Sequence, residues 1–207
     1  GLEAVSAVAV DEVYRRAKSD GLEITSDKPI GKYYARAVTI VAPGGAVFEI
    51  HTPIARNRGA RYKGVSAGPR RIEHINAFAP DTSAFGAFCE KTLGMKLSDR
   101  TADDGFRWYR AADGYHHSVA MGPGASALHH YAFDNHCLED LSRIADNLAL
   151  KDRALAWGPG RHGAGSRDRP AGPDATQPPP NVVAIPGAGR RTTGVVKNAA
   201  GRGRKAS

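Results

Sequence analysis

The chain has 207 residues, 41% of them apolar and 24% charged, which is the composition of a globular protein with one domain or two small ones. No run of about 18 apolar residues occurs, so no membrane-spanning helix is predicted. Of the formal net charge of +8, residues 161–207 carry +7, from nine Lys and Arg against two Asp. The nearly neutral remainder does not predict nucleic-acid binding, and two cysteines, Cys89 and Cys137, indicate reduced thiols in the cytoplasm rather than a disulfide scaffold.

Residues 1–55 predict one β-α-β-β-β unit. Residues 2–10 alternate like a strand, and a helical stripe that begins at Val10 then runs to Gly21, a residue typical of helix ends. Strand-like runs follow, at 22–26, 35–43 and 46–54. The polar, glycine-rich residues 56–71 are predicted to form a linker.

The same order of elements recurs after the linker. Residues 71–78 predict a strand, Asp81 is a candidate cap for a helix that ends at Gly94, and three strands follow, at 95–101, 105–112 and 116–122. A third copy has a strand at 128–133, a helix over 138–148 and a next strand at 153–163. Repetition of one β-α-β-β-β unit predicts an α+β protein built from tandem modules.

The final stretch has a different composition. Residues 163–207 contain eight Gly and six Pro, with no aromatic residue and no glutamate. Such a segment cannot bury enough apolar surface to offset its chain entropy, so residues 166–207 are predicted to be a disordered basic tail. The third unit would therefore lack two of its strands. Because no aromatic side chain is available to stack on bases, nucleic acid is not predicted as a partner.

Four of the eight histidines form two doublets, His116–His117 and His129–His130. Strand alternation predicts that His117 shares one side with Val119 and that the first histidine of each doublet faces away. His74 and His130 occupy equivalent places, the first strand of successive units. Neutral imidazole is the commonest metal ligand and the side chain best suited to proton transfer near neutral pH, so these histidines indicate part of a metal or acid-base site.

Five motifs together resemble the type I extradiol ring-cleaving dioxygenases of the vicinal oxygen chelate superfamily, such as catechol 2,3-dioxygenases and 2,3-dihydroxybiphenyl 1,2-dioxygenases. They are HINAF (74–78), FCEKTLGMKLSDR (88–100), HHSVAM (116–121), LHHYAF (128–133) and WGPGRHG (157–163). The resemblance implies tandem βαβββ modules, with residues 1–55 as the second module of an N-terminal domain. Residues 72–165 would be the catalytic domain, with a third module and a truncated fourth, so the fold would be incomplete at both ends.

The resemblance also implies a set of site residues. The family holds Fe(II) by two histidines and a glutamate, Mn(II) being an alternative metal, and His74 and His130 match the two histidines. His117 resembles the family's acid-base histidine, which holds a proton near bound oxygen. His162 matches a histidine that lines the substrate pocket. Asn76 resembles an asparagine on the oxygen side of the metal, or is an amide at a strand edge. The remaining histidines are interpreted as structural, namely His51, His116, His129 and His136.

The sequence departs from the family pattern where the third metal ligand belongs. The family has a DPxGNxxE strand after GRHG, but here the last glutamate is Glu139, and Ala184 in the run NVVAI stands where the acid would be needed. A frameshift or a damaged gene end would produce such a tail. We therefore expect weak iron binding and low turnover, with Asp168 or Asp174 as substitutes if the tail folds back.

The function that the resemblance implies is cleavage of a catechol-type ring next to the diol, with O2 as co-substrate, in the catabolism of aromatic compounds. The partners would be a small aromatic diol and O2, and intact relatives would be homo-oligomers. One alternative is a metal-free binding module of the same superfamily, which would not need His117 and His162. Another is a glyoxalase-like isomerase or lyase, which would have glutamates at strand positions where this chain has His and Ala.

Overall fold

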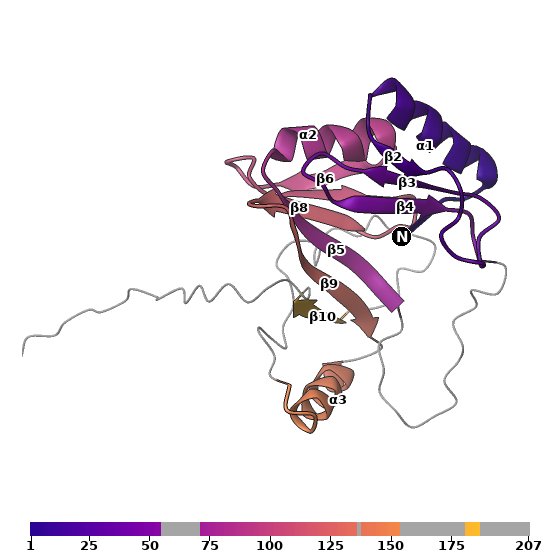
Figure 1. Ribbon diagram of the computed structural model, residues 1–207. Coiled ribbons are helices and arrows are strands. Elements are labelled where there is room, and N and C mark those ends of the chain that lie inside the picture. Colours follow the sequence, from indigo (N-terminus) through magenta and orange to yellow (C-terminus); the bar gives the residue numbers. More distant parts are fainter. Residues whose placement is uncertain (55–70, 136–137, 154–180, 187–207) are drawn as a thin grey trace, which may run out of the picture.

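The computed structural model describes residues 1–54, 71–135, 138–153 and 181–186, which form two mixed β-sheets with three α-helices (Figure 1). The four-stranded sheet has the order β1-β4-β3-β2, and the six-stranded sheet has the order β10-β9-β5-β8-β7-β6. None of the helices in the described residues could span a membrane.

The first unit supplies the four-stranded sheet and one helix. Its elements are β1 (Leu2–Glu3), α1 (Ala7–Ser19), β2 (Ile24–Ser26), β3 (Ala37–Val41) and β4 (Val47–His51). The prediction of a strand over residues 2–10 is wrong beyond Glu3. The Ser6 side chain accepts a hydrogen bond from the Ala9 amide, which satisfies a free N–H group at the start of a helix. Burial of Val10, Val13 and Ala17 at helical spacing then stabilises α1.

The second unit repeats the first. It consists of β5 (Arg71–Ala79), α2 (Thr82–Ala87), the π-helical turn η1 (Phe88–Thr92), β6 (Lys96–Arg100), β7 (Arg107–Arg110) and β8 (Val119–Pro123). In each unit the first strand pairs in parallel with the last, β1 with β4 and β5 with β8, and the other pairs are antiparallel. This shared topology confirms the predicted α+β fold of tandem βαβββ modules.

The third unit departs from this topology. Its described elements are β9 (Ala127–Asn135), α3 (Leu138–Ala149) and β10 (Asn181–Pro186), and β9 lies antiparallel to β5. β10 lies beside β9 but runs antiparallel to it, whereas the last strand of each other unit runs parallel to the first. β10 therefore does not repeat the fourth strand of a module. It also falls in the stretch whose composition predicts disorder, and residues 181–186 are an exception to that prediction.

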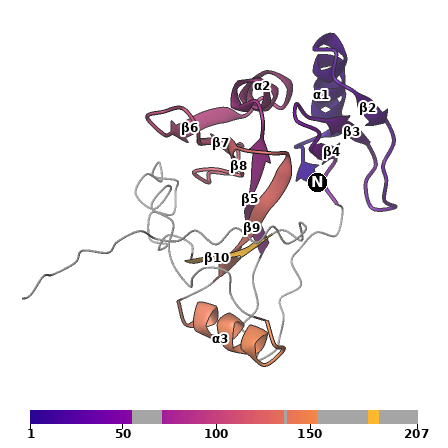
Figure 2. The same ribbon diagram turned by 60° about the vertical axis from the view of Figure 1, so that its left-hand side comes forward.

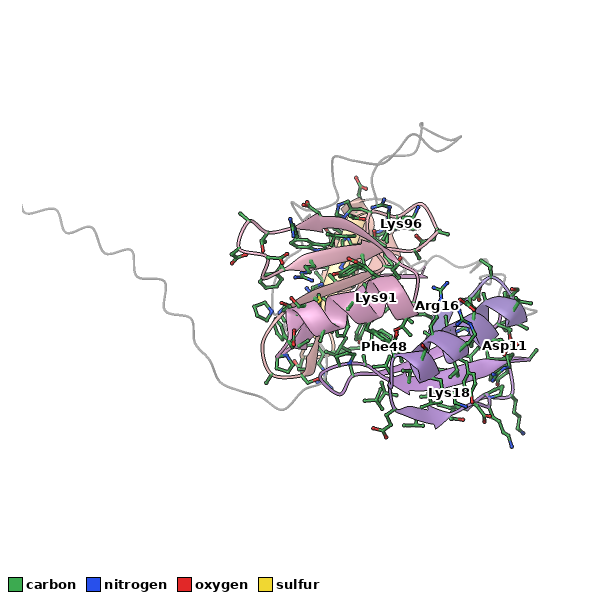
Figure 3. All side chains as sticks on the ribbon, turned by 90° about the horizontal axis from the view of Figure 1, so that it is seen from above. Asp11, Arg16, Lys18, Phe48, Lys91 and Lys96 are labelled. Carbon is green, nitrogen blue, oxygen red and sulfur yellow. The ribbon has the colours of Figure 1, made fainter. Side chains whose placement is uncertain are left out.

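The two complete units share one apolar core. Helices α1 and α2 lie side by side on the same side of the sheets, and Phe48 lies between the two units in the view from above (Figures 1 and 3). The Phe48 ring is 6.0 Å from that of Phe85 and 5.4 Å from that of Phe88, measured between centroids. Arg16 Nη1 also donates a hydrogen bond to the carbonyl oxygen of Lys91 (3.3 Å). The two units are therefore in direct contact through this core.

Strand β5 separates this core from the opposite face of the sheet. Ala77 and Ala79 belong to the core cluster, and Ile75 packs against it. Because successive residues of a strand face opposite sides, His74 and Asn76 lie on the other face, where both are buried. Figure 2 shows β5 and β9 side by side, with β10 and α3 beyond them at the end away from α1 and α2. The candidate site lies on this second face.

Candidate metal centre

Three neighbouring strands, β9, β5 and β8, bring the predicted site histidines together. Asn76 on β5 is in register with His130 on β9, and His74 is in register with Ala132. Side chains of directly paired residues lie on the same face of a sheet, so His74, Asn76 and His130 share one face. His117 immediately precedes Ser118 and β8, and its side chain reaches the same place from the other side of β5.

The histidine rings are in direct contact. The Nε2 atoms of His74 and His130 are 3.3 Å apart, with ring planes at 78°. The His117 ring lies 4.2 Å from the His74 ring between centroids. All three side chains are buried, with exposed fractions of 3% for His74 and 5% for His117 and His130. The sequence prediction that these residues form one cluster therefore agrees with their positions, and their chemical roles stay predictions.

The separation of the two Nε2 atoms suits a shared cation. Imidazole nitrogen binds a zinc ion at about 2.0–2.1 Å, and two such ligands at roughly right angles on one ion lie about 3 Å apart. The same separation also allows one Nε2–H group to donate a hydrogen bond to the other Nε2 atom. Within the described residues no group of three His, Cys, Asp or Glu side chains is placed to hold a metal ion. Within these residues, His74 and His130 bring two nitrogen atoms together that are able to bind a metal ion.

Asn76 contributes a buried acceptor to the same face. Its side chain is 8% exposed, and its Oδ1 atom has no hydrogen-bond partner among the described residues. A buried carbonyl oxygen without a partner costs about 1–3 kcal/mol, so such atoms usually serve a bound molecule or water. Oδ1 can accept a hydrogen bond from a hydroxyl group held beside the two histidines.

The structure adds three residues that the sequence analysis did not place at the site. Glu73 Oε2 lies 3.3 Å from His74 Nδ1, His129 Nδ1 lies 2.6 Å from His130 Nδ1, and His116 Nδ1 lies 3.1 Å from His117 Nδ1. The first histidine of each doublet is predicted to face away from the site, and in the structure its Nδ1 atom lies close to Nδ1 of the histidine that follows it. The sequence feature that could have indicated these contacts is the polar residue directly before each of the three histidines.

The alternation predicted for His117 is also wrong. Val119 belongs to the apolar core, whereas the His117 ring contacts His74 on the opposite face. The regular strand begins only at Val119, and the irregular backbone before it turns the His117 side chain to the other side. The period of two applies within a strand and cannot be extended past its end.

The other predicted residues lie elsewhere. His51 is buried in the first sheet, stacks on Tyr34 at 3.9 Å and has Nδ1 3.0 Å from the Thr52 carbonyl oxygen, as expected of a structural histidine. His162, His136, Asp168 and Asp174 lie outside the described residues. Ala184 is in register with Ala132, which in turn is in register with His74. Position 184 is therefore two strands from the first histidine.

Cys89 belongs to the core side of the sheet and takes no part in this site. Its thiol is free and buried, and that burial raises its pKa well above the ordinary value for cysteine. A thiol that stays protonated is unreactive toward oxidants and metal ions. The prediction of a reduced thiol fits Cys89, and Cys137 lies outside the described residues.

Comparison with known proteins identifies two proteins of similar sequence. No family model matches the chain. The chain is 34% identical over 100 residues to metapyrocatechase 2 of Cupriavidus necator, a match that covers 47% of this chain and 31% of that protein. It is 25% identical over 174 residues to the manganese-dependent 2,3-dihydroxybiphenyl 1,2-dioxygenase of Geobacillus genomosp. 3, covering 74% of this chain and 55% of that one. The matches thus span 31% of the first relative and 55% of the second.

Solved structures show the same fold. The Mn(II)-bound glyoxalase from Novosphingobium aromaticivorans superimposes with a TM-score of 0.69 at 28% identity, covering 79% of this chain and 54% of that one. An extradiol ring-cleaving dioxygenase from B. fuscum superimposes with a TM-score of 0.66 at 24% identity, over 78% of this chain and 48% of the other. The tandem βαβββ modules therefore define a protein of the vicinal oxygen chelate fold. Within that class, its relatives in sequence are the type I extradiol dioxygenases.

Proposed function

We propose that this chain is an extradiol dioxygenase that binds a divalent metal weakly, because one protein ligand is missing. Both curated relatives named above carry names of ring-cleaving enzymes. The observation that carries the proposal is the pair of buried Nε2 atoms, 3.3 Å apart, on the strands β5 and β9. A metal-free binding module would have no need to bury two imidazoles in this arrangement.

Each residue of the site has a specific task in this proposal. His74 and His130 hold Fe(II) or Mn(II), and the bound ion supplies Lewis-acid and redox chemistry for the reaction of the diol with O2. His117, whose ring lies against that of His74, holds a proton beside the reacting oxygens and returns it as the ring opens. Asn76 Oδ1 accepts a hydrogen bond from a hydroxyl group of the bound substrate or of water. His162, by the family resemblance, would contact the substrate.

The proposed reaction is the addition of O2 to a catechol-type ring. The bond between one hydroxyl-bearing carbon and its unsubstituted neighbour breaks, and both oxygen atoms of O2 enter the product. The ring-opened product is a semialdehyde or a keto acid and is yellow. No other reductant or oxidant is required, because O2 accepts the electrons of the bond that breaks.

The test is anaerobic loading of the purified chain with Fe(II) or Mn(II), followed by metal analysis and an ultraviolet-visible assay with catechol and 2,3-dihydroxybiphenyl. We expect metal well below one equivalent after desalting, and slow yellow product formation that is lost in His74→Ala and His130→Ala. Near-stoichiometric metal with rapid turnover would contradict the missing ligand. Product formation that survived both substitutions would contradict the site itself.

The likeness to a Mn(II)-bound glyoxalase supports a second candidate, a metal-dependent isomerase or lyase of the same fold. Among the described strand residues that share the face of His74 and His130, none is a glutamate, the residue expected for that activity. A glyoxalase assay on the same metal-loaded protein separates the two candidates, since only the dioxygenase consumes O2. The cytoplasmic location and the homo-oligomeric state stay predictions.

A further inference from the structure

His117, the histidine proposed for proton transfer, stands in the connection between β7 and β8, and its side chain does not follow the alternation of β8. Val119, two residues later, is in register with Ile75 and belongs to the apolar core. Continued alternation would place His117 in that core, yet its ring lies 4.2 Å from the His74 ring on the opposite face, between centroids. The backbone conformation of residues 111–118 therefore decides the direction of this side chain.

Asp113 closes this loop by two hydrogen bonds. Its Oδ1 atom accepts one from the backbone N–H group of Tyr115 (3.1 Å), and its Oδ2 atom accepts one from the hydroxyl group of Ser118 (2.9 Å). The first is the local bond with which aspartate side chains stabilise turns. Gly114 has a φ of 79°, a left-handed conformation that glycine adopts without strain, so the chain can reverse directly after Asp113. One carboxylate thus joins both ends of the segment that contains His117.

The far end of the loop is fixed to the sheet. The Ser118 amide donates a hydrogen bond to the Tyr109 carbonyl oxygen (2.8 Å), and the Ser118 carbonyl oxygen accepts one from the Ile75 amide (3.1 Å). These bonds tie Ser118 to β7 and to β5, the two strands on either side of β8. The bond from its hydroxyl group therefore anchors Asp113 to a fixed point, and His117 lies directly beside that point.

We propose that Asp113 is a positioning residue for His117, because it holds residues 113–118 in the conformation that directs the imidazole ring to His74. Asp113 is exposed and acts through the backbone of the loop. His116, whose Nδ1 atom lies 3.1 Å from Nδ1 of His117, is part of the same loop. This inference rests on the proposed function for the task of His117, whereas the direction of its ring can be measured independently of that function.

The first test is proton NMR of the metal-free protein, with nuclear Overhauser effects between the ring protons of His117 and His74 as the readout. We expect these effects in the wild type, because the two rings are in contact. Asp113→Ala should weaken them, since the loss of two hydrogen bonds of ordinary net strength shifts the populations of ring directions about 10-fold. Asp113→Asn should retain them, because its amide oxygen can accept from the Tyr115 N–H group and its amide nitrogen can donate to the Ser118 hydroxyl oxygen.

Asp103 supplies the matched control. In the turn between β6 and β7, its Oδ1 atom accepts hydrogen bonds from the Gly105 amide (3.1 Å) and the Thr101 hydroxyl group (2.5 Å), the same kinds of donor as at Asp113. That turn does not contain His117, so Asp103→Ala should leave the effects between His117 and His74 unchanged. Effects between the rings of His74 and His130 are the internal control, and they should be equal in the wild type and in every variant.

A second measurement follows the reaction of the Fe(II)-loaded chain. Asp113→Ala should lower kcat by up to about 10-fold, the size of the population shift, and leave Mn(II) affinity unchanged, because His117 is not a proposed ligand. Undiminished effects between His117 and His74 in Asp113→Ala, or an equal loss of those between His74 and His130, would overturn the positioning role. A wild-type chain without turnover would overturn the proposed function, and the NMR comparison would still decide the role of Asp113.

Discussion

His74 and His130 approach each other across the β5–β9 pair so that their Nε2 atoms are 3.3 Å apart, although 56 positions separate them in the chain. The distance depends on the register that pairs Asn76 with His130 and His74 with Ala132. A shift of one residue would move either histidine to the opposite face, into the apolar core. The histidine cluster therefore forms only when β5 and β9 pair in this register.

Replacement of either histidine is expected to weaken metal binding strongly. His130→Ala removes one of the two proposed ligands, so the affinity for Mn(II) should fall by more than the roughly 10–100-fold that loss of an outer partner causes. Calorimetric titration measures the change. His51→Asn is the control, because His51 is also buried but lies in the first sheet. An equal loss of affinity in both variants would indicate a general effect on folding instead of a ligand role.

A carboxylate introduced on β10 is expected to strengthen the site. Position 184 is paired with Ala132, and Ala132 with His74, so a glutamate there would stand in the row of the first histidine. Ala184→Glu should raise the Mn(II) affinity at least about 10-fold, since even outer partners change affinity by that factor. Val183→Glu adds the same charge one residue earlier, on the opposite face of the strand. Equal gains in both variants would indicate a non-specific effect of charge.

The core shared by the two units is expected to make them unfold together. Phe48 is 6% exposed and contacts Phe85 and Phe88 of the second unit. Phe48→Ala should lower the free energy of unfolding by about 3–5 kcal/mol, measured by urea denaturation with circular dichroism and tryptophan fluorescence. Both signals should shift together. Val47→Ala is the neighbouring control: Val47 is 64% exposed, and its loss should change stability by no more than about 0.5 kcal/mol. Separate transitions for the two signals would contradict the shared core.

Stability is expected to fall in alkaline solution because of Cys89. Burial raises the pKa of its thiol in the folded state, whereas in the unfolded state the pKa is near its usual value of about 8.5. Above that pH the unfolded chain binds fewer protons than the folded chain, so the free energy of unfolding decreases as pH rises. Urea denaturation of Cys137→Ser between pH 8 and 10 measures the slope. Cys89→Ala in the same background should show a smaller slope, and equal slopes would exclude the thiol as the cause.

The same burial predicts that Cys89 is unreactive in the native protein. In Cys137→Ser, where Cys89 is the one remaining cysteine, Ellman's reagent should react at least about 100-fold more slowly in buffer than in denaturant, since the reagent needs an exposed thiolate. Rapid reaction in buffer would show that the core around Cys89 opens readily.

Much of this architecture could be predicted from local patterns. The helical spacing of Val10, Val13 and Ala17 gave α1, and Gly21, with its φ of 68°, follows the end of that helix as expected. The recurrence of His74 and His130 in equivalent strands placed both on β5 and β9. The start of α1 was missed, because Val5 and Val8 continue an alternating pattern although both are exposed. The Ser6 cap, a single hydrogen bond, determines that boundary.

The sequence alone predicted the repeated βαβββ units, because helical and strand periods are properties of neighbouring residues. The three candidate site histidines came from the family resemblance of the motifs that contain them. Only the tertiary structure decided which ring atoms meet. The contacts of Glu73 with His74 and of His129 with His130 depend on side-chain rotamers, and the 3.3 Å between Nε2 atoms depends on strand register. The local sequence pattern also did not predict that β10 runs antiparallel to β9. Direction and register are set by packing between segments far apart in the chain, which no local period records.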